Sequence, residues 1–419
     1  TNVSYADSVA LDSFGRLRVS SPTTLFDAQQ EYGLDTLRVW DGAANGTYTS
    51  ASTDGSASSG GNAVGPTNAS TRLTPITCSG TDTHYSILQS RRYARYIPGK
   101  GQLILMTGIF APAASSSMSL VRRTSTSGSA VDNEVPQASW NIDKFDGTGI
   151  SGITLDFTKT QILVIQAQWL GVGRVIAGFD VNGIIYPAHQ FLHANILTVP
   201  YTQTFNLPVR YEIRQETTNN VARCGYFDHA NGVFLKASKA QSGGTIQMVC
   251  CSVQSEGGTE DRGFPRARGS LTAISVTTRR AVLSIRPKAT FNSRTNRAAI
   301  ELANFSLTAA TNNAYYEIVL GGTLGGVPAW TSVSTDSVME YDVAGTTVTG
   351  GTVVDSGFVL EGAGATRSQT SGQVSTRAPF ALSQIDALAA RQDSISIVCT
   401  SFTGTSSITS SINWFEQTV

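Results

Sequence analysis

The chain has 419 residues, of which 30 are basic and 30 acidic, so its formal net charge at neutral pH is zero. This balance excludes a global attraction to nucleic acid or to an anionic membrane, and we expect partners to be recognised by shape and local contacts. Only 14% of the residues are charged, 40% are hydrophobic, and 40 are glycine. This composition is typical of β-sheets joined by many turns and is a poor one for a helical enzyme.

Residues 1–70 are expected to form an extended N-terminal arm and a linker. The stretch "DSFGRLRVSSPTTLFDAQQEYG" mixes short apolar pairs with turn residues, so it gains little by packing on itself and suits contact with a neighbouring subunit. Residues 42–70 are a low-complexity segment that cannot bury a core. The first residues lack the basic start and apolar segment of a signal peptide. No apolar run approaches the roughly 20 residues of a membrane span, so we expect no membrane partner.

Residues 71–275 are predicted to form a first antiparallel β-sandwich. Apolar runs of strand length occur in "HYSILQSRRYARYIPGKGQLILMTGIF", "ITLDFTKTQILVIQAQWLGVG", "RVIAGFDVNGIIYPAHQFLH", "LPVRYEIR" and "TIQMVCCSV". The sharpest hairpin signal is Asn182–Gly183, which lies between two apolar runs. Short strands joined by such turns favour a sandwich.

Residues 276–419 are predicted to form a second β-sandwich with one short helix. Strand candidates include "AAIELANFSL", "AYYEIVLGGTL", "SISIVCTSF" and "SITSSINWFE". The helix is expected in "PFALSQIDALAARQD", where Pro379 suits the first turn and apolar residues recur on one face. The fold class is therefore expected to be mostly β, with two antiparallel β-sandwich domains preceded by an extended N-terminal arm.

The five cysteines are odd in number and contain no C-x-x-C pair, which argues against a disulfide framework or a zinc knuckle. We expect reduced, mostly buried thiols and folding inside a cell.

The segment "AHQFLHAN" places His189 and His193 four residues apart, the spacing of a zinc protease helix. Gln190 stands where such a protease has its glutamate base. The preceding sequence alternates at a period near two, so the histidines are expected on one face of a strand, about 13 Å apart and too distant to share an ion. We interpret them as hydrogen-bonded sheet histidines.

Other chemical motifs are weak. Asp143 and Asp146 lie in a Gly-rich turn that resembles a calcium loop only loosely, and Asp often caps turns without metal. "GVGRVIAG" lacks the helix and third glycine of a dinucleotide site. Four histidines and no G-x-S-x-G elbow give little basis for nucleophilic catalysis. We therefore predict no catalytic residue, no metal, no cofactor and no enzyme, although a pair of glycosidase carboxylates would leave no sequence pattern.

The segment "QSRRYARYIPGK" is the most basic and aromatic patch. Arg and Tyr in such a patch can stack on bases or sugars, but they equally anchor protein interfaces. With zero net charge, the subunit interface is the favoured interpretation. The predicted interface residues, from the arm and from this patch, are Phe14, Arg16, Arg18, Phe26, Arg91, Arg92, Tyr93, Arg95 and Tyr96.

Several long phrases are similar to a family of tailed-bacteriophage virion structural proteins. They are "ALDSFGRLRVSSPTTLFDAQQEYG", "RRYARYIPGKGQLILMTGIF", "NLPVRYEIR" and the stretch from "VRRTSTSGSAVDNEVPQASWNIDKFDGTGISG" to "YPAHQFLHAN". The resemblance covers most of residues 9–260, with a weaker one at "YYEIVLGGTLGGVPAWTSV". One departure is that "GYFDHANGVF" follows "VRYEIR" here, whereas in the family a similar segment follows the "MTGIF" strand. This departure leaves the strand order around residues 219–237 open.

The resemblance implies a homo-oligomeric virion component that is assembled in the host bacterial cytoplasm, and it favours the tail (tail sheath or tail-associated) over the head. The chain also resembles the sheath-like tail protein of short-tailed phages of the N4 type. Virion proteins assemble in symmetric rings, so a trimer or hexamer in contact with other virion proteins is expected. The sequence does not decide between the tail and the head.

Two alternatives remain open. The first is a capsid decoration or head fibre protein, which would have the same kind of amino-acid composition. A carbohydrate-binding module that recognises a host surface glycan would use an exposed tryptophan as a sugar platform, and the residues considered for this role are Trp140, Trp169, Trp330 and Trp414. A polysaccharide depolymerase is a third and weaker alternative.

Overall fold

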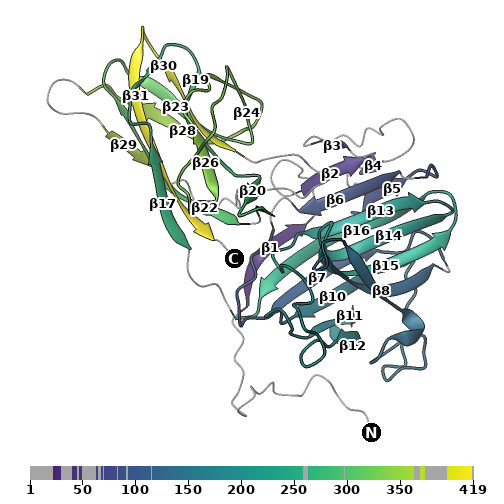
Figure 1. The fold of residues 1–419 in the computed structure, drawn as a ribbon. Helices are drawn as coiled ribbons and strands as arrows, with labels where there is room; N and C mark the ends of the chain where they lie inside the picture. The colour runs from purple at the N-terminus through teal and green to yellow at the C-terminus, as the bar shows by residue number, and fades with distance from the viewer. Residues whose placement is uncertain are drawn as a thin grey trace. The chain divides into compact units, whose positions relative to one another are not determined.

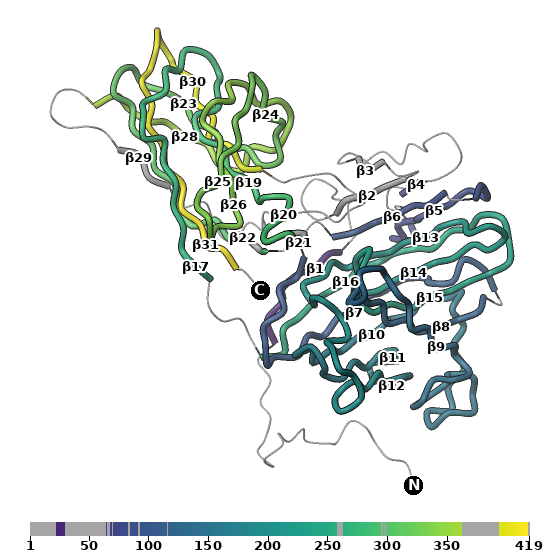
Figure 2. Tube along the Cα trace, in the orientation of Figure 1, coloured from purple at the N-terminus to yellow at the C-terminus, as the bar shows by residue number. Residues whose placement is uncertain are grey.

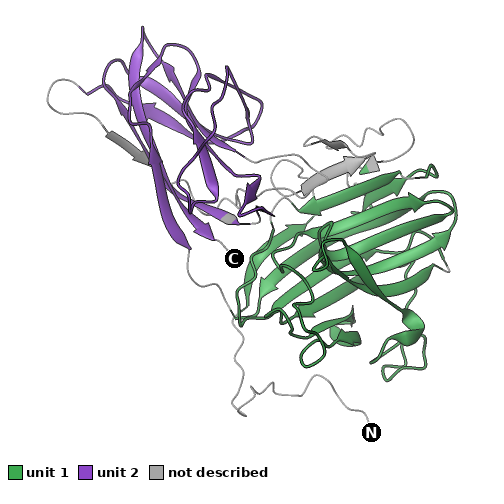
Figure 3. Cartoon of the chain, viewed as in Figure 1, with its two compact units in different colours: residues 1–260 green, residues 261–419 purple. Residues whose placement is uncertain are grey.

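The computed structural model describes residues 22–29, 40–44, 47–49, 63–64, 68, 70–82, 84–90, 93–114, 116–257, 263–296, 298–362, 369–372 and 394–417. The chain divides into two compact units, residues 1–260 and residues 261–419 (Figure 3). Both are built almost entirely of antiparallel β-strands, as the sequence predicts (Figure 1). In the part of the chain that the structure describes, no helix is long and apolar enough to cross a membrane.

The first unit is made of two large sheets and a short 3₁₀-helix, η2 (Gln137–Ser139). Its strands are β1 (Thr23–Gln29), β2 (Trp40–Ala44), β3 (Thr47–Thr49), β4 (Ala63–Val64), β5 (Thr74–Cys78), β6 (Tyr85–Ser90), β7 (Gln102–Ile109), β8 (Ser117–Thr124), β9 (Val131–Pro136), β10 (Gln161–Ala167), β11 (Val175–Val181), β12 (Ile184–Phe191), β13 (Val209–Glu216), β14 (Asn219–Phe227), β15 (Gly232–Ala240) and β16 (Gly244–Ser255).

One sheet of this unit has the order β12-β11-β10-β7-β16-β5-β4, with β1 also paired to β16. The other, which we name the outer-charged sheet, has the order β3-β2-β6-β13-β14-β15-β8-β9. The chain can be followed through both in Figure 2. One continuous apolar cluster contains residues of both sheets, including Ile104, Met106 and Tyr211, which are all fully buried. Each such side chain contributes about 1.5–3 kcal/mol to stability.

Alternation of side chains explains the strand positions. In β7 the burial of successive residues alternates along its whole length, because neighbouring side chains of a strand point to opposite faces. The longest strand of the second unit, β31, alternates in the same way over Ser406–Gln417. Ile104 and Met106 of β7 belong to the core of the first unit, and Ile408, Ile412 and Trp414 of β31 belong to that of the second.

The second unit contains a smaller pair of sheets, with the orders β17-β31-β22-β29 and β25-β26-β19-β30-β23-β28. Its strands are β17 (Phe264–Gly269), β18 (Ile274–Val276), β19 (Arg280–Pro287), β20 (Thr290–Phe291), β21 (Arg294–Thr295), β22 (Ala299–Ala309), β23 (Ala314–Leu320), β24 (Thr323–Gly325), β25 (Thr331–Ser332), β26 (Met339–Asp342), β27 (Thr347–Thr349), β28 (Thr352–Val359), β29 (Gln369–Gly372), β30 (Ile395–Ser401) and β31 (Ser406–Gln417).

The predicted boundary near residue 275 lies too late in the chain. The second unit begins at Asp261, because β17 and β18 both pair with β31 near the C-terminus. Local patterning could not reveal this, since the partner strand is separated from them by more than a hundred residues. The helix predicted from Pro379 onward lies outside the described residues.

The predicted arm and linker contain sheet strands of the first unit. β1 pairs antiparallel with β16, with Thr23 opposite Ser255 and Gln29 opposite Cys250. Within the low-complexity segment, β2 pairs with β6 and β4 pairs with β5. Val64 is 3% exposed and belongs to the core. The expectation that residues 42–70 bury no core is therefore wrong at Val64.

The hairpin predicted at Asn182–Gly183 is confirmed. These residues connect β11 to β12 and have φ values of 58° and 84°, as a two-residue type I′ turn requires. The open question about residues 219–237 is also answered, because β13, β14 and β15 form consecutive antiparallel neighbours.

The five cysteine thiols are free. Burial raises the pKa of Cys78 to about 11 and that of Cys399 to about 12, and it also raises the pKa of Cys224 and Cys251. Cys250 is only half-buried. Because the thiolate is the reactive form, we expect a thiol reagent at neutral pH to label Cys250 first. The other four should react only after unfolding, and peptide mapping of the labelled protein checks this order.

Candidate functional site

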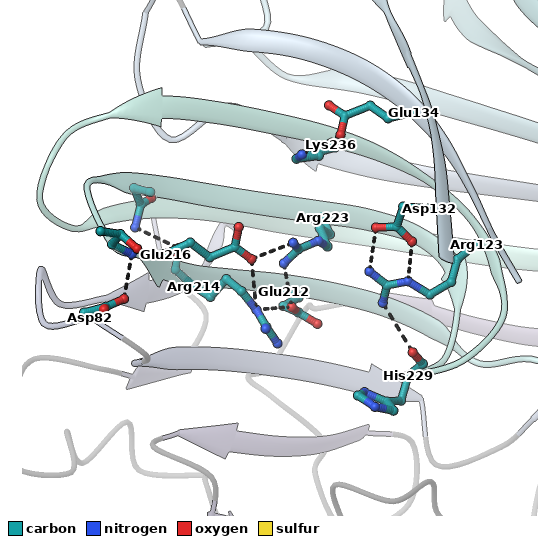
Figure 4. Close-up of polar contacts among 12 residues, drawn as sticks. Asp82, Arg123, Asp132, Glu134, Glu212, Arg214, Glu216, Arg223, His229 and Lys236 are labelled. Carbon is teal, nitrogen blue, oxygen red and sulfur yellow. Dashed lines mark hydrogen bonds and ion pairs between the residues drawn. The ribbon is translucent and has the colours of Figure 1, made fainter. Parts of the chain in front are cut away.

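The outer-charged sheet carries a row of charged side chains on the face that points away from the core. The sequence "RYEIRQE" of β13 alternates, so Tyr211 and Ile213 face the core while the residues between them face outward. Figure 4 shows Glu212, Arg214 and Glu216 of this strand together with charged residues of the neighbouring strands β14, β15, β8 and β9. Arg210, Glu212, Arg214 and Glu216 are the outward residues of β13.

Glu212 is the centre of this row, although its side chain is only 2% exposed. Its Oε2 accepts hydrogen bonds from Nε and Nη2 of Arg210 at 2.9 and 2.6 Å. Its Oε1 accepts one from Nη1 of Arg223 at 3.1 Å and lies 2.6 Å from Nε of Arg214. Burial alone would raise the pKa of Glu212, but the charges of the arginines outweigh it and hold the pKa well below the ordinary value of 4.5.

The network extends across the sheet (Figure 4). Arg223 Nη2 donates to Glu216 Oε1 at 2.6 Å. Arg123 of β8 binds Asp132 of β9 through two parallel hydrogen bonds of 2.7 and 2.9 Å. This bidentate pairing is the strongest geometry for an arginine and a carboxylate. Lys236 of β15 lies 2.6 Å from Glu134 of β9.

A small apolar cluster packs beneath the charged side chains of the network. Val121, Phe227 and Phe234 form a small buried cluster separate from the main core. The guanidinium of Arg123 lies 5.0 Å from the ring centre of Phe234, and that of Arg210 lies 5.4 Å from the ring centre of Phe227. The side chains of Arg210 and Glu212 are almost fully buried. Together with the cation–π contacts, this burial indicates that the network holds neighbouring strands of the sheet together.

This arrangement offers little for acid–base chemistry. A retaining or inverting glycosidase needs one carboxyl whose pKa is raised, so that it donates a proton at neutral pH. In the network, the pKa of Glu212 is lowered by its arginines. The pKa of Asp132, which burial would raise, is likewise lowered by Arg123. Among the described residues, no group of three or more His, Cys, Asp or Glu side chains is placed to hold a metal ion.

The predicted basic and aromatic patch is largely internal. Tyr93 and Tyr96 are 5% and 1% exposed, and Tyr96 packs edge-on against Trp169 and Phe205. The ring of Tyr96 is thus enclosed by its own unit. The expectation that Tyr93 and Tyr96 contact another subunit is therefore wrong. Arg95 is half-buried, and its carbonyl accepts a hydrogen bond from Gln102.

Phe26 is 7% exposed and packs into the core from β1, so it contacts its own chain and the expectation of an intersubunit role is corrected. The sequence pattern of "TTLFDAQ" does not indicate which sheet this strand joins. The remaining predicted interface residues lie outside the described residues. They are Phe14, Arg16, Arg18, Arg91 and Arg92.

The two histidines behave as sheet and loop residues. His189 lies in β12, where its Nδ1 accepts a hydrogen bond from the backbone N–H of Asn141 at 3.2 Å. His193 lies beyond the end of β12 and is 1% exposed. Its Nδ1 donates to the carbonyl of Gly173 at 2.6 Å. Hydrogen bonding is as predicted for both, but only His189 belongs to the strand.

Asp143 and Asp146 organise their own turns. Asp143 is buried, and its two oxygens accept from the backbone N–H groups of Phe145 and Ser151 at 2.8 and 2.7 Å. Asp146 is exposed and accepts from the backbone and hydroxyl of Thr148 at 2.9 and 2.6 Å. Each carboxylate therefore caps a separate turn, which is the common role of Asp in loops.

The tryptophans considered as sugar platforms are mostly covered. Trp140 and Trp414 are 3% and 1% exposed and belong to the two cores. Trp169 is half-buried and donates from Nε1 to Thr202 at 2.7 Å. Trp330 is half-buried as well, with the guanidinium of Arg286 lying 4.0 Å from its ring centre.

Comparisons with known proteins add little. No family model matches the chain, and no curated protein matches it. Among solved structures, the chain is similar to a Bacillus licheniformis beta-glucanase, with 9% sequence identity, a TM-score of 0.16, and coverage of 55% of this chain and 96% of that chain. A TM-score of this size gives no basis for a functional inference.

Proposed function

We propose that this chain is a non-enzymatic structural subunit of a bacteriophage virion, namely a homo-oligomeric tail component. The proposal is supported by the position of the sequence resemblance along the chain. It covers most of residues 9–260, and the first compact unit spans residues 1–260. The resemblance to tail structural proteins therefore extends over one complete folding unit rather than over a scattered motif.

Apolar side chains exposed near one sheet edge support contact with other subunits. β12 is the edge strand of its sheet, and an edge strand presents unpaired backbone groups that can bind another chain. Ile184 and Ile185 on this strand are 40% and 44% exposed, and Ile196 and Val199 in the following loop are 66% and 53% exposed. Single exposed apolar residues are ordinary, but several along one segment are typical of an interaction surface.

The second unit has a comparable feature. Phe358 of β28 is 61% exposed and Phe402 is 55% exposed, and their ring centres lie 5.7 Å apart. β28 is the edge strand of its sheet. Exposed aromatic side chains of this kind are enriched at protein interfaces, which is consistent with a subunit that meets neighbours through both units.

Mass determination of the purified chain tests self-assembly. We expect a trimer or hexamer at micromolar concentration, and a shift toward monomer for Ile196→Asp, because a charge placed in a buried contact is costly. Val327→Asp is the matched control, since Val327 is 85% exposed in the second unit. A chain lacking residues 1–21 tests the predicted contribution of Phe14, Arg16 and Arg18.

A monomer for the full chain at every concentration would contradict self-assembly. If Ile196→Asp and Val327→Asp formed assemblies of the same mass, the interface would not lie at the β12 edge. Specific binding of a host glycan by the monomer would instead support the carbohydrate-binding alternative.

A further inference from the structure

Two loops of the first unit expose aliphatic side chains and contain no Asp or Glu. One, residues 168–174, connects β10 to β11, and the other, residues 192–200, follows β12. Both leave the sheet at the same end, since Ala167 lies opposite Val175 and Val175 lies opposite Phe191. The aliphatic side chains of the two loops that are 36–66% exposed, which we name the aliphatic surface, are Leu170, Val172, Leu192, Ile196 and Val199.

Hydrogen bonds fix the backbone of these two loops. His193 Nδ1 donates to the carbonyl of Gly173 at 2.6 Å, and the backbone N–H of Tyr201 donates to the carbonyl of Gly171 at 2.9 Å. The imidazole of His193 also stacks on the ring of Tyr201, with centroids 3.9 Å apart. Within the first loop, the N–H of Gly173 donates to the carbonyl of Trp169 at 2.6 Å. A surface that is already ordered loses little conformational entropy on binding, which suits a specific protein contact.

Leu170 of the first loop has a strained backbone. Its φ is 38°, in the left-handed region that favours glycine. Its N–H donates to the hydroxyl of Tyr96 at 3.2 Å, and the preceding Trp169 packs against the core. These neighbours hold the backbone in place, while the Leu170 side chain is 61% exposed. Strain of this kind is concentrated at functional sites, so it is consistent with a binding role for the loop.

The second unit exposes a group of aromatic and apolar side chains near the end of β28. Tyr315 of β23 lies opposite Phe358 of β28, with ring centres 5.7 Å apart, and the ring of Phe402 lies 5.7 Å from that of Phe358. Phe358, Leu360 and Phe402 are 61%, 57% and 55% exposed. We name these four residues the aromatic surface. Neighbouring exposed apolar side chains of this kind mark an interaction site.

An exposed charge of opposite sign accompanies each surface. Arg174 is the last residue of the first loop, and Glu361 directly follows Leu360. Among the described residues, no carboxylate forms an ion pair with Arg174 and no basic side chain forms one with Glu361. Glu361 Oε2 accepts a hydrogen bond from the backbone N–H of Asn312 at 2.7 Å, which orders this carboxylate. The aliphatic surface is therefore accompanied by a positive charge and the aromatic surface by a negative one.

These charges favour contact between the two different surfaces. Contact of either surface with the same surface of another copy would bring two arginines or two glutamates into one interface, where like charges are unfavourable. Contact between the two kinds of surface brings Arg174 to Glu361 and covers aliphatic side chains with aromatic ones. Because every chain carries both surfaces, such a head-to-tail contact can repeat from copy to copy, and it closes into a ring when the rotation allows.

We propose that the aliphatic surface of one copy binds the aromatic surface of a second copy of this chain. The inference rests on the proposed homo-oligomer and names the contact that builds it. Ile196 and Phe402 supply apolar area to the contact, and Arg174 pairs with Glu361. In a closed ring both surfaces of every copy are occupied, whereas a chain with one damaged surface retains the other.

Mixing two variants of the full chain tests this pairing. Ile196→Asp damages only the aliphatic surface and Phe402→Asp only the aromatic surface, so each variant alone should be monomeric. In an equimolar mixture, the intact aromatic surface of Ile196→Asp can bind the intact aliphatic surface of Phe402→Asp. Sedimentation should then show a mixed dimer of twice the 44.3 kDa chain mass and nothing larger. The concentration series extends above that needed for the wild-type chain, because a single contact holds the mixed dimer.

Matched controls place the same change outside both surfaces. Ile150 of the first unit and Leu271 of the second are 73% and 89% exposed. Ile150→Asp and Leu271→Asp should each assemble as the wild-type chain does. Val199→Asp mixed with Leu360→Asp repeats the mixing test at other positions of the two surfaces.

Charge reversal tests the same contact independently. Arg174→Glu alone and Glu361→Arg alone should each weaken assembly about tenfold at low ionic strength, because each brings like charges together. Both substitutions in one chain should restore assembly, since every contact then regains opposite charges.

Three results would overturn the proposal while the wild-type chain still assembles. They are an equimolar mixture that stays monomeric, a mixture that forms assemblies larger than a dimer, and a double charge reversal that does not restore assembly. A wild-type chain that is monomeric at every concentration would instead contradict the proposed homo-oligomer itself, and this contact with it.

Discussion

Glu212→Gln is expected to destabilise the first unit by about 3–5 kcal/mol, the usual cost of leaving buried charges without their partner. The substitution keeps the shape of the side chain but removes the charge that pairs with Arg210, Arg214 and Arg223. Arg210 is 1% exposed and Arg223 is 7% exposed, so neither can recover its hydration without opening the sheet. Urea denaturation monitored by circular dichroism gives the free energy of unfolding.

Glu134→Gln is the matched control for this variant. Its partner Lys236 is 20% exposed and Glu134 is 37% exposed, so the pair is partly solvated. An exposed pair contributes about 0–1 kcal/mol, and we expect a loss in this range. Equal losses for the two variants would contradict the role of Glu212 as the centre of the network.

The stability that Glu212 contributes is expected to depend on pH. Because the pKa of folded Glu212 lies well below 4.5, the stability that its ionised form contributes is fully present above that pH. It is lost as the pH falls below 4.5 toward the folded value. The wild-type chain should therefore lose more stability than Glu212→Gln over this acidic range. Parallel curves for the two proteins would show that Glu212 is not responsible.

The second large effect is expected for Trp414→Ala, which should destabilise the second unit by about 3–5 kcal/mol through loss of a large buried side chain. Trp414 is 1% exposed on β31, the strand that joins β17, β18 and β22. Its Nε1 also donates to Glu416 at 3.1 Å. Glu416 in turn accepts from Ser337 and from the backbone of Val338, so the substitution disturbs a buried polar group as well.

Hydrogen exchange with peptide resolution separates the two units. In Trp414→Ala, peptides from β22 and β31 should lose protection, while peptides from β7 and β16 should keep theirs, because the units have separate apolar cores. Trp330→Ala, which removes a half-buried ring, should leave both patterns nearly unchanged. Loss of protection throughout the chain would contradict independent folding of the two units.

Local sequence patterns predict the strands well because alternation and turn chemistry are local. The Asn182–Gly183 turn and the strands on either side of it follow from a few adjacent residues. The pairing of β1 with β16 does not, since it joins residues more than two hundred positions apart. The low-complexity composition of residues 42–70 likewise conceals short strands, which are recognised only by their pairing with β6 and β5.

The polar sites were harder to predict for the same reason. The alternating charges of "RYEIRQE" suggest a solvated strand face, and only the fold brings Phe227 and Phe234 beneath them. The five arginine and tyrosine residues of "RRYARY" resemble a surface patch, although Tyr93 and Tyr96 are buried in the core.

If a phage encodes this chain, as we propose, quantitative mass spectrometry of its purified particles tests the central proposal most directly. A tail subunit should be present on the order of tens of copies per particle, as expected of symmetric rings, and it should remain with isolated tails after the heads are removed. Hundreds of copies that remain with the heads would indicate a capsid decoration protein instead. Absence of the chain from purified particles would contradict a structural role in the virion.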